Sequence, residues 1–271
     1  MFKTLVAGAA LAVSFASAPA MAGAIHNADL YTTNTLARND DGYTGLVNLG
    51  FNINFFGQSF SQLHVNNNGN VTFGQALDVY TPFNLVTTNR SILAPFFADV
   101  DTRNLNSGVT QYGQATVNGR QTFGVNWINV GYYDRQADKT NSFQLILTDR
   151  SDTGAGNFDF QFNYDKITWE TGSASNGTNG FGGSSARAGW SNGTTNSFEL
   201  AGSAVNGALL NTGSHALVTH SLNSGIDGQY NFSVRNGTVI PAVPEPETYA
   251  MLLAGLGVMG AMARRRRARQ A

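Results

Sequence analysis

The sequence predicts an all-β fold, namely an antiparallel β-sandwich-like single domain flanked by short targeting segments. Three observations support this prediction. Apolar and polar residues alternate over short runs, turn signals separate those runs, and no long stretch of helical periodicity interrupts them between residues 47 and 236. Strands without intervening helices favour antiparallel pairing, because parallel neighbours need long crossover connections.

The clearest predicted strand lies at residues 158–165, where aromatic and polar side chains alternate. The aromatic positions are Phe158, Phe160, Phe162 and Tyr164. Successive side chains of a strand point to opposite faces, so this pattern predicts one aromatic face on the core and one face in water. Residues 145–147 form a continuous apolar run instead, which is typical of a strand covered on both sides.

Two turn signals separate predicted strands. Asn118 and Gly119 lie between residues 114–117 and 122–130, and an Asn-Gly pair in this position strongly indicates a β-hairpin. The sequence Asn67-Asn68-Gly69 separates residues 63–65 from 71–73 in the same way. We therefore expect tight antiparallel connections at both places.

Composition excludes several classes of protein. The 271 residues include no cysteine, so disulfides, thiolate zinc sites and cysteine nucleophiles are ruled out. Without the terminal segments, ten basic and fifteen acidic side chains remain, a net charge of about −5. Binding to nucleic acid needs clustered Lys and Arg, so we expect no nucleic-acid partner.

The N-terminus predicts a secretory signal peptide at residues 1–22. Lys3 supplies the positive charge and residues 5–15 the apolar core, while Ala20 and Ala22 form a small-residue cleavage site. Cleavage is expected before Gly23. Residues 23–46 are polar and are interpreted as an N-terminal lead-in to a β domain at residues 47–236.

The C-terminus combines three features in a fixed order. A linker at residues 237–248 contains Val243, Pro244, Glu245 and Pro246, and an apolar transmembrane segment is predicted at residues 249–263. A basic cytoplasmic tail at residues 264–271 contains Arg264, Arg265, Arg266 and Arg267. Fifteen helical residues span roughly 22 Å, less than a hydrocarbon core of about 30 Å, so the anchor is marginal. The arginines place the domain on the periplasmic side of the inner membrane.

This C-terminal segment resembles the PEP-CTERM sorting signal of Gram-negative bacteria. The resemblance lies in the order of Pro-Glu-Pro, short apolar helix and arginine cluster. It implies recognition by exosortase, with transient anchoring in the inner membrane followed by transfer to the cell surface or extracellular matrix. An ordinary C-terminal tail anchor is the alternative.

A second resemblance covers roughly residues 47–235. Residues 92–102 read ILAPFFADVDT, which is similar to a motif of nidogen-like (NIDO) domains, although Phe97 stands where Trp is more usual. Further matching segments follow in order at residues 123–127, 141–147, 158–164 and 186–190. The resemblance implies a non-catalytic domain of the type found in extracellular matrix and adhesion proteins. It favours a role in cell-matrix adhesion or in a biofilm exopolysaccharide matrix, with a polysaccharide or matrix protein as partner.

Asp99 and Asp101 are the candidate metal ligands. Two residues apart on a strand, they would share one face, and Asn104 and Asn106 continue the series of oxygen donors. Such donors suit a hard cation, so calcium is the one candidate cofactor. The other interpretation is structural: both carboxylates cap the turn that follows and pair with Arg103 or Arg187.

Two further functions remain as alternatives. Trp169 and Trp190, which flank a Gly-rich segment, are candidate stacking platforms for a glycan, whereas Trp127 lies within a strand pattern and is expected in the core. An exported hydrolase is the third hypothesis. The sequence shows no motif of a nucleophile elbow, phosphate-binding loop or zinc protease, so we predict no enzyme activity and no catalytic residues.

Overall fold

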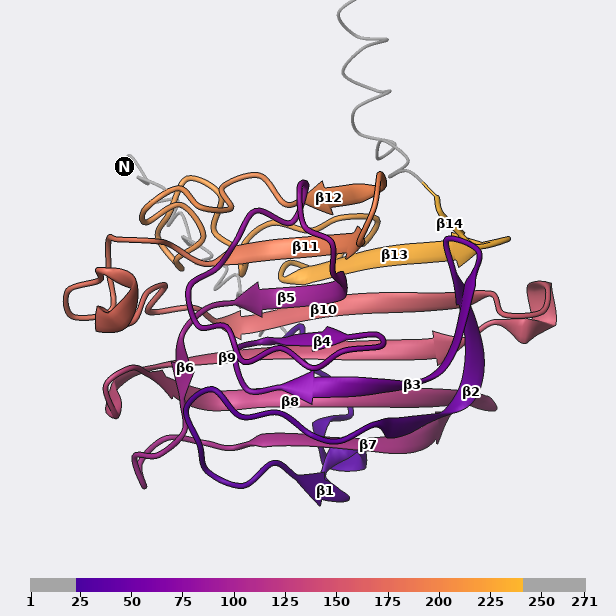
Figure 1. Cartoon of the computed structure of the whole chain (residues 1–271), viewed down its shortest axis with the longest axis horizontal. Coiled ribbons are helices and arrows are strands. Elements are labelled where there is room, and N and C mark those ends of the chain that lie inside the picture. Colours follow the sequence, from indigo (N-terminus) through magenta and orange to yellow (C-terminus); the bar gives the residue numbers. More distant parts are fainter. Residues whose placement is uncertain (1–22, 241–271) are drawn as a thin grey trace, which may run out of the picture.

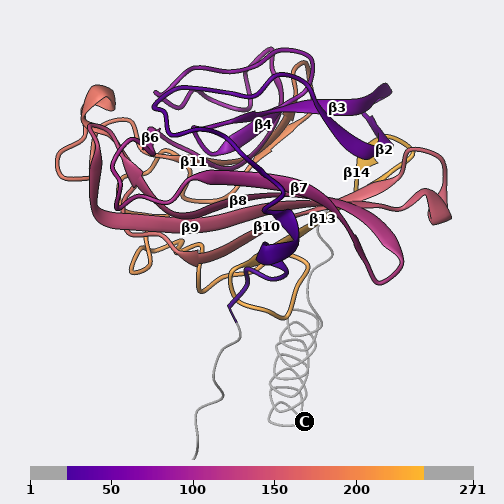
Figure 2. The same cartoon turned by 90° about the horizontal axis from the view of Figure 1, so that it is seen from below.

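The computed structural model describes residues 23–240, which form two antiparallel β-sheets packed face to face. Figure 1 shows the shorter strands β3, β4, β5 and β11 of one sheet in front of the longer strands of the other and running in roughly the same direction, and Figure 2 shows the two layers from the side. Every pairing between named strands is antiparallel. The predicted all-β antiparallel architecture is confirmed for the described part of the chain.

The larger sheet has the strand order β1-β7-β8-β9-β10-β13-β14, with β6 also paired to β8. Its strands are β1 (Asn34–Thr35), β6 (Val100–Asp101), β7 (Thr110–Val117), β8 (Arg120–Tyr132), β9 (Gln136–Asp149), β10 (Phe158–Lys166), β13 (Gln229–Arg235) and β14 (Thr238–Val239).

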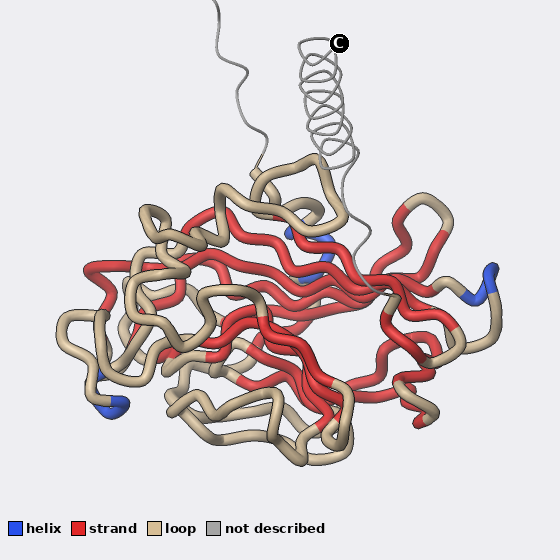
Figure 3. The backbone as a smooth tube through the Cα atoms, turned by 90° about the horizontal axis from the view of Figure 1, so that it is seen from above, coloured by secondary structure: helices blue, strands red, loops and turns tan. Residues whose placement is uncertain are grey.

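The smaller sheet has the order β12-β11-β5-β4-β3-β2. Its strands are β2 (Val47–Phe55), β3 (Gln58–Asn66), β4 (Asn70–Thr72), β5 (Ser91–Phe97), β11 (Arg187–Asn192) and β12 (Ser197–Glu199). Three short 3-10 helices, η1 (Ala28–Tyr31), η2 (Ser151–Thr153) and η3 (Ser173–Ser175), lie in the connections outside both sheets (Figure 3).

The space between the sheets is filled largely by aromatic side chains. In β10, Phe158, Phe160 and Phe162 are fully buried, which confirms the face predicted from the alternation. The ring of Phe160 stacks on that of Phe232 in β13 at a centroid distance of 4.6 Å. The smaller sheet contributes Phe96, whose ring lies 5.3 Å from that of Phe143 in β9. Aromatic contacts within and between the sheets thus build one continuous core.

The predicted hairpin and the doubly covered strand are also confirmed. Asn118 and Gly119 connect β7 to β8 with φ angles of 50° and 77°, the left-handed conformation that a type I′ turn requires. In β9, Ile146 is buried although it points away from Leu145 and Leu147. The apolar run therefore packs on both faces of the sheet.

The N-terminal segment packs on the outer face of the larger sheet. Figure 2 shows η1 on the side of this sheet opposite the smaller one. The ring of Tyr31 lies over Gly124 of β8, where an added Cβ would come within 2.3 Å of it. Residues 23–46, expected to lead into the domain, thus cover part of its surface.

A row of buried amides lies beneath this segment. Asn126, Gln144 and Asn163 stand side by side on β8, β9 and β10 and are linked by hydrogen bonds of 2.9 and 3.0 Å. The side chain of Asn126 also donates to the carbonyl of Ala28. The outer face of β10 was expected to be exposed to water, but Asn163 on that face is fully buried. The alternation of apolar and polar residues could not predict this, because it does not reveal which residues a distant segment covers.

Two predicted segments lie outside the described residues. They are the predicted signal peptide, residues 1–22, and the tail from residue 241 onward, for which a transmembrane segment was predicted and which contains Pro244, Pro246 and the arginines at 264–267. Within residues 23–240, no helix has the length and apolar character needed to cross a bilayer.

Truncating the central aromatic contact tests the core. Replacement of Phe160 by Ala should lower the free energy of unfolding by about 3–5 kcal/mol, because it removes a buried ring and leaves a cavity. Its neighbour Gln161 is only partly buried, so Gln161→Ala should change that free energy by about 0.5 kcal/mol or less. Urea denaturation of both variants gives the two values, and equal losses would contradict the assignment of faces.

Candidate functional site

The turn between β3 and β4 is buried, which is unusual for a tight connection. The side chains of Asn66, Asn67, Asn68 and Asn70 are at most 1% exposed. Gly69 has a φ of +70°, and an added Cβ would lie 1.8 Å from the carbonyl oxygen of Phe96. Only glycine fits there, and its lack of a side chain lets the turn pack closely against β5 in the interior.

The amides of Asn67 and Asn68 connect two segments that are far apart in the sequence. The side chain of Asn67 donates to the carbonyls of Asp40 and Val100. The Oδ1 atom of Asn68 accepts from the backbone N–H of Val100 at 2.9 Å, and its Nδ2 atom donates to Asp41 Oδ1 at 2.8 Å. Residues 39–42 and 98–102 are therefore held side by side on one buried turn.

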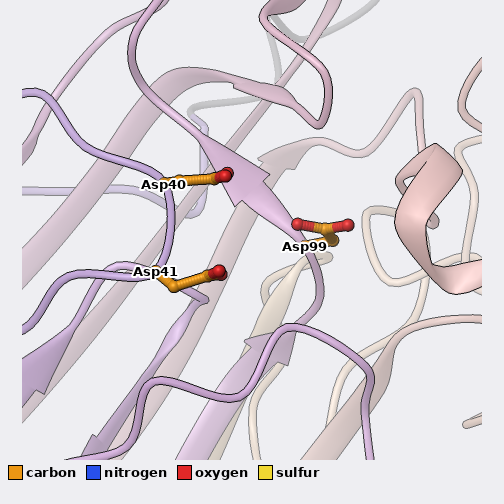
Figure 4. A group of neighbouring side chains, drawn as sticks. All are labelled: Asp40, Asp41 and Asp99. Atoms are coloured by element: carbon orange, nitrogen blue, oxygen red, sulfur yellow. The ribbon is translucent and has the colours of Figure 1, made fainter.

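This arrangement brings three carboxylates together at the end of the smaller sheet. One oxygen from each of Asp40, Asp41 and Asp99 lies within 4.8 Å of the others. Figure 4 shows Asp99, in the connection from β5 to β6, facing the two aspartates of the N-terminal segment. We refer to Asp40, Asp41 and Asp99 as the aspartate cluster.

Asp99 is the most constrained member of the aspartate cluster. Its residue is 1% exposed, and neither carboxylate oxygen has a hydrogen-bond partner among the described residues. Its Oδ2 atom rests against Gly172, where an added Cβ would lie only 2.2 Å away. Burying an ionised carboxylate without a partner is strongly unfavourable, so this side chain needs a compensating proton or cation.

Asp101 lies next to the cluster but has a different set of contacts. Its carboxylate accepts from the guanidinium of Arg103 through Nε and Nη2, and from the backbone N–H of Arg103 and of Arg135. Arg103 also places Nη2 3.0 Å from Asp40 Oδ2 and 3.3 Å from Asp134 Oδ1. Arg103 thus compensates Asp101 fully and the aspartate cluster only in part.

The pKa values of these groups follow from the same contacts. Burial, together with the charges of Asp40 and Asp41, raises the pKa of Asp99 to about 8. Burial and the charges of Asp101 and Asp41 raise the pKa of Asp40 to about 7. Burial acts to raise the pKa of Asp101 as well, but the hydrogen bonds from Arg103 and Arg135 outweigh it and lower that pKa. A raised pKa means that the ionised cluster opposes folding when nothing else binds it.

The two carboxylates predicted from the sequence as metal ligands, Asp99 and Asp101, have different surroundings in the structure. Asp99 and Asp101 do not share a strand face, because β5 ends at Phe97 and β6 begins at Val100, leaving Asp99 in the connection. The alternative interpretation, pairing with Arg103, is confirmed for Asp101. Asn104 accepts from the N–H of Asn106 and donates to the carbonyl of Arg135, so it shapes the following turn.

Asp40 and Asp41 were not among the predicted ligands. They are adjacent in a polar segment followed by glycine, a pattern that is equally typical of a solvated turn. Nothing local connects that segment to Asp99. Only the buried turn between β3 and β4 does so, and its burial is a tertiary feature.

The proposed aromatic platforms are core residues. Trp169 is fully buried and Trp190 is 8% exposed, so neither ring offers a free face to a glycan. The Nε1 atom of Trp169 donates to the carbonyl of Val130, as Trp127 does to Asn67, both at 3.0 Å. Gly180 of the Gly-rich segment, residues 171–186, packs against Trp169, where an added Cβ would lie 2.9 Å from the Cβ of Trp169. The sequence does not reveal this contact. Trp127 lies in the core as predicted.

Two family models match the chain. The model of the nidogen-like domain matches residues 61–236, and the model of the PEP-CTERM protein-sorting motif matches residues 242–267. The chain belongs to the nidogen-like domain family. Both resemblances noted in the sequence are thereby confirmed.

Several animal proteins contain a segment similar to this nidogen-like domain. Alpha-tectorin from Mus musculus and from Homo sapiens are each 31% identical to the chain over 228 residues, which is 75% of this chain and 10% of each relative. Nidogen from Drosophila melanogaster is 29% identical over 131 residues, 40% of this chain and 10% of the relative. The chain thus matches about a tenth of the length of these relatives. No solved structure matches it significantly.

Removing the amide of Asn68 tests whether the buried turn carries this region. Asn68→Ala removes the Oδ1 acceptor that the buried N–H of Val100 shares with the carbonyl of Ala98, and it removes the Nδ2 donor to Asp41. The free energy of unfolding should therefore fall by about 1–3 kcal/mol. Asn106→Ala, at an exposed position of a neighbouring loop, should change it by about 0.5 kcal/mol or less. Urea denaturation followed by tryptophan fluorescence measures both, and an unchanged Asn68→Ala variant would show that the turn is dispensable.

Proposed function

We propose that this protein is an exported, non-catalytic surface protein whose nidogen-like domain acts in cell-matrix adhesion or in an exopolysaccharide matrix. The observation that carries the proposal is the order of two modules in one chain. A nidogen-like domain at residues 61–236 is followed directly by a PEP-CTERM sorting motif at residues 242–267. The motif supports a surface destination, and the domain supports a binding role there.

Each part of the tail has a physical task in this proposal. Pro244 and Pro246 keep the chain extended, so that exosortase can reach it at the membrane surface. Residues 249–263 hold the chain in the inner membrane beside that enzyme. The arginines from 264 to 267 resist translocation, because each charge in hydrocarbon costs about 2.5–3.5 kcal/mol.

The chemistry of the described residues supports a binding or structural role over catalysis. The most perturbed carboxylate, Asp99, is 1% exposed and so is sealed from any substrate. The indole N–H groups of Trp127 and Trp169 donate to backbone carbonyls within the core, so they are not free to bind a ligand. Burial of Trp169 and Trp190 also weakens the alternative of a glycan site built on those rings. Within residues 23–240, no side-chain arrangement supports the alternative of an exported hydrolase.

Two sets of substitutions in the tail test the sorting part of the proposal. Replacing Pro244 and Pro246 by Ala should leave anchoring intact but block processing, so an unprocessed form accumulates in the inner membrane. Replacing the arginines at 264–267 by Ser should let the tail slip through the membrane or detach. Immunoblots of membrane and external fractions, with a tag after residue 23, report both results. Processing and export of the proline variant at the level of the natural protein would reduce the tail to a simple anchor.

The adhesion part is tested by co-sedimentation of the exported protein with matrix polysaccharide extracted from the producing cells. Retention that competes with added free polysaccharide is the expected result. If the protein is correctly sorted yet remains entirely in the supernatant, the polysaccharide is not its partner. A protein component of the matrix is then examined in the same assay.

A further inference from the structure

Within the described residues, the negative charge of the aspartate cluster is only partly balanced by positive groups. Among the described residues, Arg103 forms ion pairs with Asp40, Asp101 and Asp134, but none with Asp41 or Asp99. Asp101 takes most of the hydrogen bonds that Arg103 donates. Oδ1 of Asp40 and both oxygens of Asp99 are buried without a hydrogen-bond partner. The unmatched negative charge is therefore concentrated where these oxygens meet.

We propose that Asp40, Asp41 and Asp99 bind one hard divalent cation, calcium, between the N-terminal segment and the connection from β5 to β6. The carboxylate of Asp99 is the observation that points to a ligand, because it is 1% exposed, unpartnered and directed at the other two aspartates (Figure 4). The inference concerns the folded domain alone and holds whether or not that domain binds a matrix.

The spacing of the cluster fits a shared ion. Calcium–oxygen distances of 2.3–2.6 Å allow two oxygens on one ion to be at most about 5 Å apart. The three carboxylate oxygens lie within 4.8 Å of one another, inside that limit. Asp41 keeps Oδ1 on the amide of Asn68 at 2.8 Å, which orients the carboxylate toward the cluster.

The kind of donor selects the kind of metal. All three groups are carboxylates, with no histidine or cysteine among them, and oxygen donors favour calcium or magnesium over transition metals. Magnesium demands near-ideal octahedral geometry and gives up water reluctantly, whereas calcium accepts six to eight oxygens in irregular arrangements. Asp40 and Asp41 are only partly buried, so water can complete the coordination on their side.

The site would also have a structural consequence. Asp40 and Asp41 belong to the segment before β2, and Asp99 follows β5, so one ion would tie the N-terminal segment to the smaller sheet. Burial and the neighbouring carboxylates raise the pKa values of Asp40 and Asp99, and Arg103 offsets this only in part, as expected where a cluster of carboxylates lacks a full complement of positive charge. Extracellular calcium modules bind with dissociation constants of about 10⁻⁴–10⁻³ M, the range expected for a partly open site with three carboxylates.

Calorimetry and thermal unfolding of the exported protein test the proposal. After treatment with EDTA and dialysis, titration with calcium chloride should show one site with a Kd of about 0.1–1 mM. Calcium at 10 mM should raise the Tm by roughly 5–10 °C if the Kd lies near 0.1 mM. Magnesium chloride at the same concentration should give a clearly smaller shift.

Two variants locate the site. Asp99→Asn should bind calcium at least tenfold more weakly, while its Tm in EDTA stays equal to or above that of the natural protein, because the amide removes a buried charge. Asp134→Asn is the matched control: Asp134 also contacts Arg103, but its side chain is 59% exposed and lies outside the cluster, so binding should be unchanged. If Asp99→Asn is not exported, Asp41→Asn replaces it with the same expectation.

The proposal is overturned by either of two results. One is the absence of both heat and Tm shift in the natural protein at 10 mM calcium. The other is an Asp99→Asn or Asp41→Asn variant that responds to calcium as the natural protein does. Neither result bears on sorting or on binding to polysaccharide, so failure here and failure of the proposed function are separate outcomes.

Discussion

The hydrogen bonds of Asn67 and Asn68 are the constraint on which the rest of this domain depends. A tight turn normally lies at the surface, because its backbone polar groups need water. Here the turn between β3 and β4 is buried, and neighbouring polypeptide takes the place of that water. The side chain of Asn67 donates to the carbonyls of Asp40 and Val100 and accepts from the hydroxyl of Thr110 in β7. Its backbone carbonyl accepts from the indole N–H of Trp127, and Oδ1 of Asn68 accepts from the N–H of Val100. Because these amides reach the N-terminal segment, the connection after β5 and the larger sheet, they fix how the three meet.

The aspartate cluster follows directly from that arrangement. The turn brings Asp40 and Asp41 alongside residues 98–102, and Gly172 closes the far side of Asp99. An arrangement with three adjoining carboxylates and one shared arginine reduces stability unless a proton or a cation balances it. Asp101, close by, accepts hydrogen bonds from the guanidinium and backbone N–H of Arg103 and from the backbone N–H of Arg135, so its negative charge is balanced. The contrast between Asp101 and Asp99 is the reason for assigning a ligand to the second and not to the first.

The sequence pattern correctly predicted those parts of the fold that depend only on residues close together in the chain. The alternation around Phe160 and the Asn118-Gly119 hairpin follow from strand periodicity and turn conformation, and the structure has both. The features that were not predicted all depend on distant segments. Asn163 is buried beside Gln144, which bonds to His26 of the N-terminal segment, and Gly180 packs against Trp169. Asp99 meets Asp40 through the buried turn. Asp99 was recognised as a candidate from its residue type, but its partners could not be, because the sequence carries no local signal of that tertiary contact.

The cation site that we propose is assembled by the buried turn from the aspartate cluster. Anomalous diffraction from crystals of the protein grown with calcium tests it most directly. We expect one anomalous peak within about 2.3–2.6 Å of a carboxylate oxygen from each of Asp40, Asp41 and Asp99. Crystals that hold calcium elsewhere, or that show these carboxylates sharing protons at close oxygen–oxygen contact with no peak between them, would contradict it.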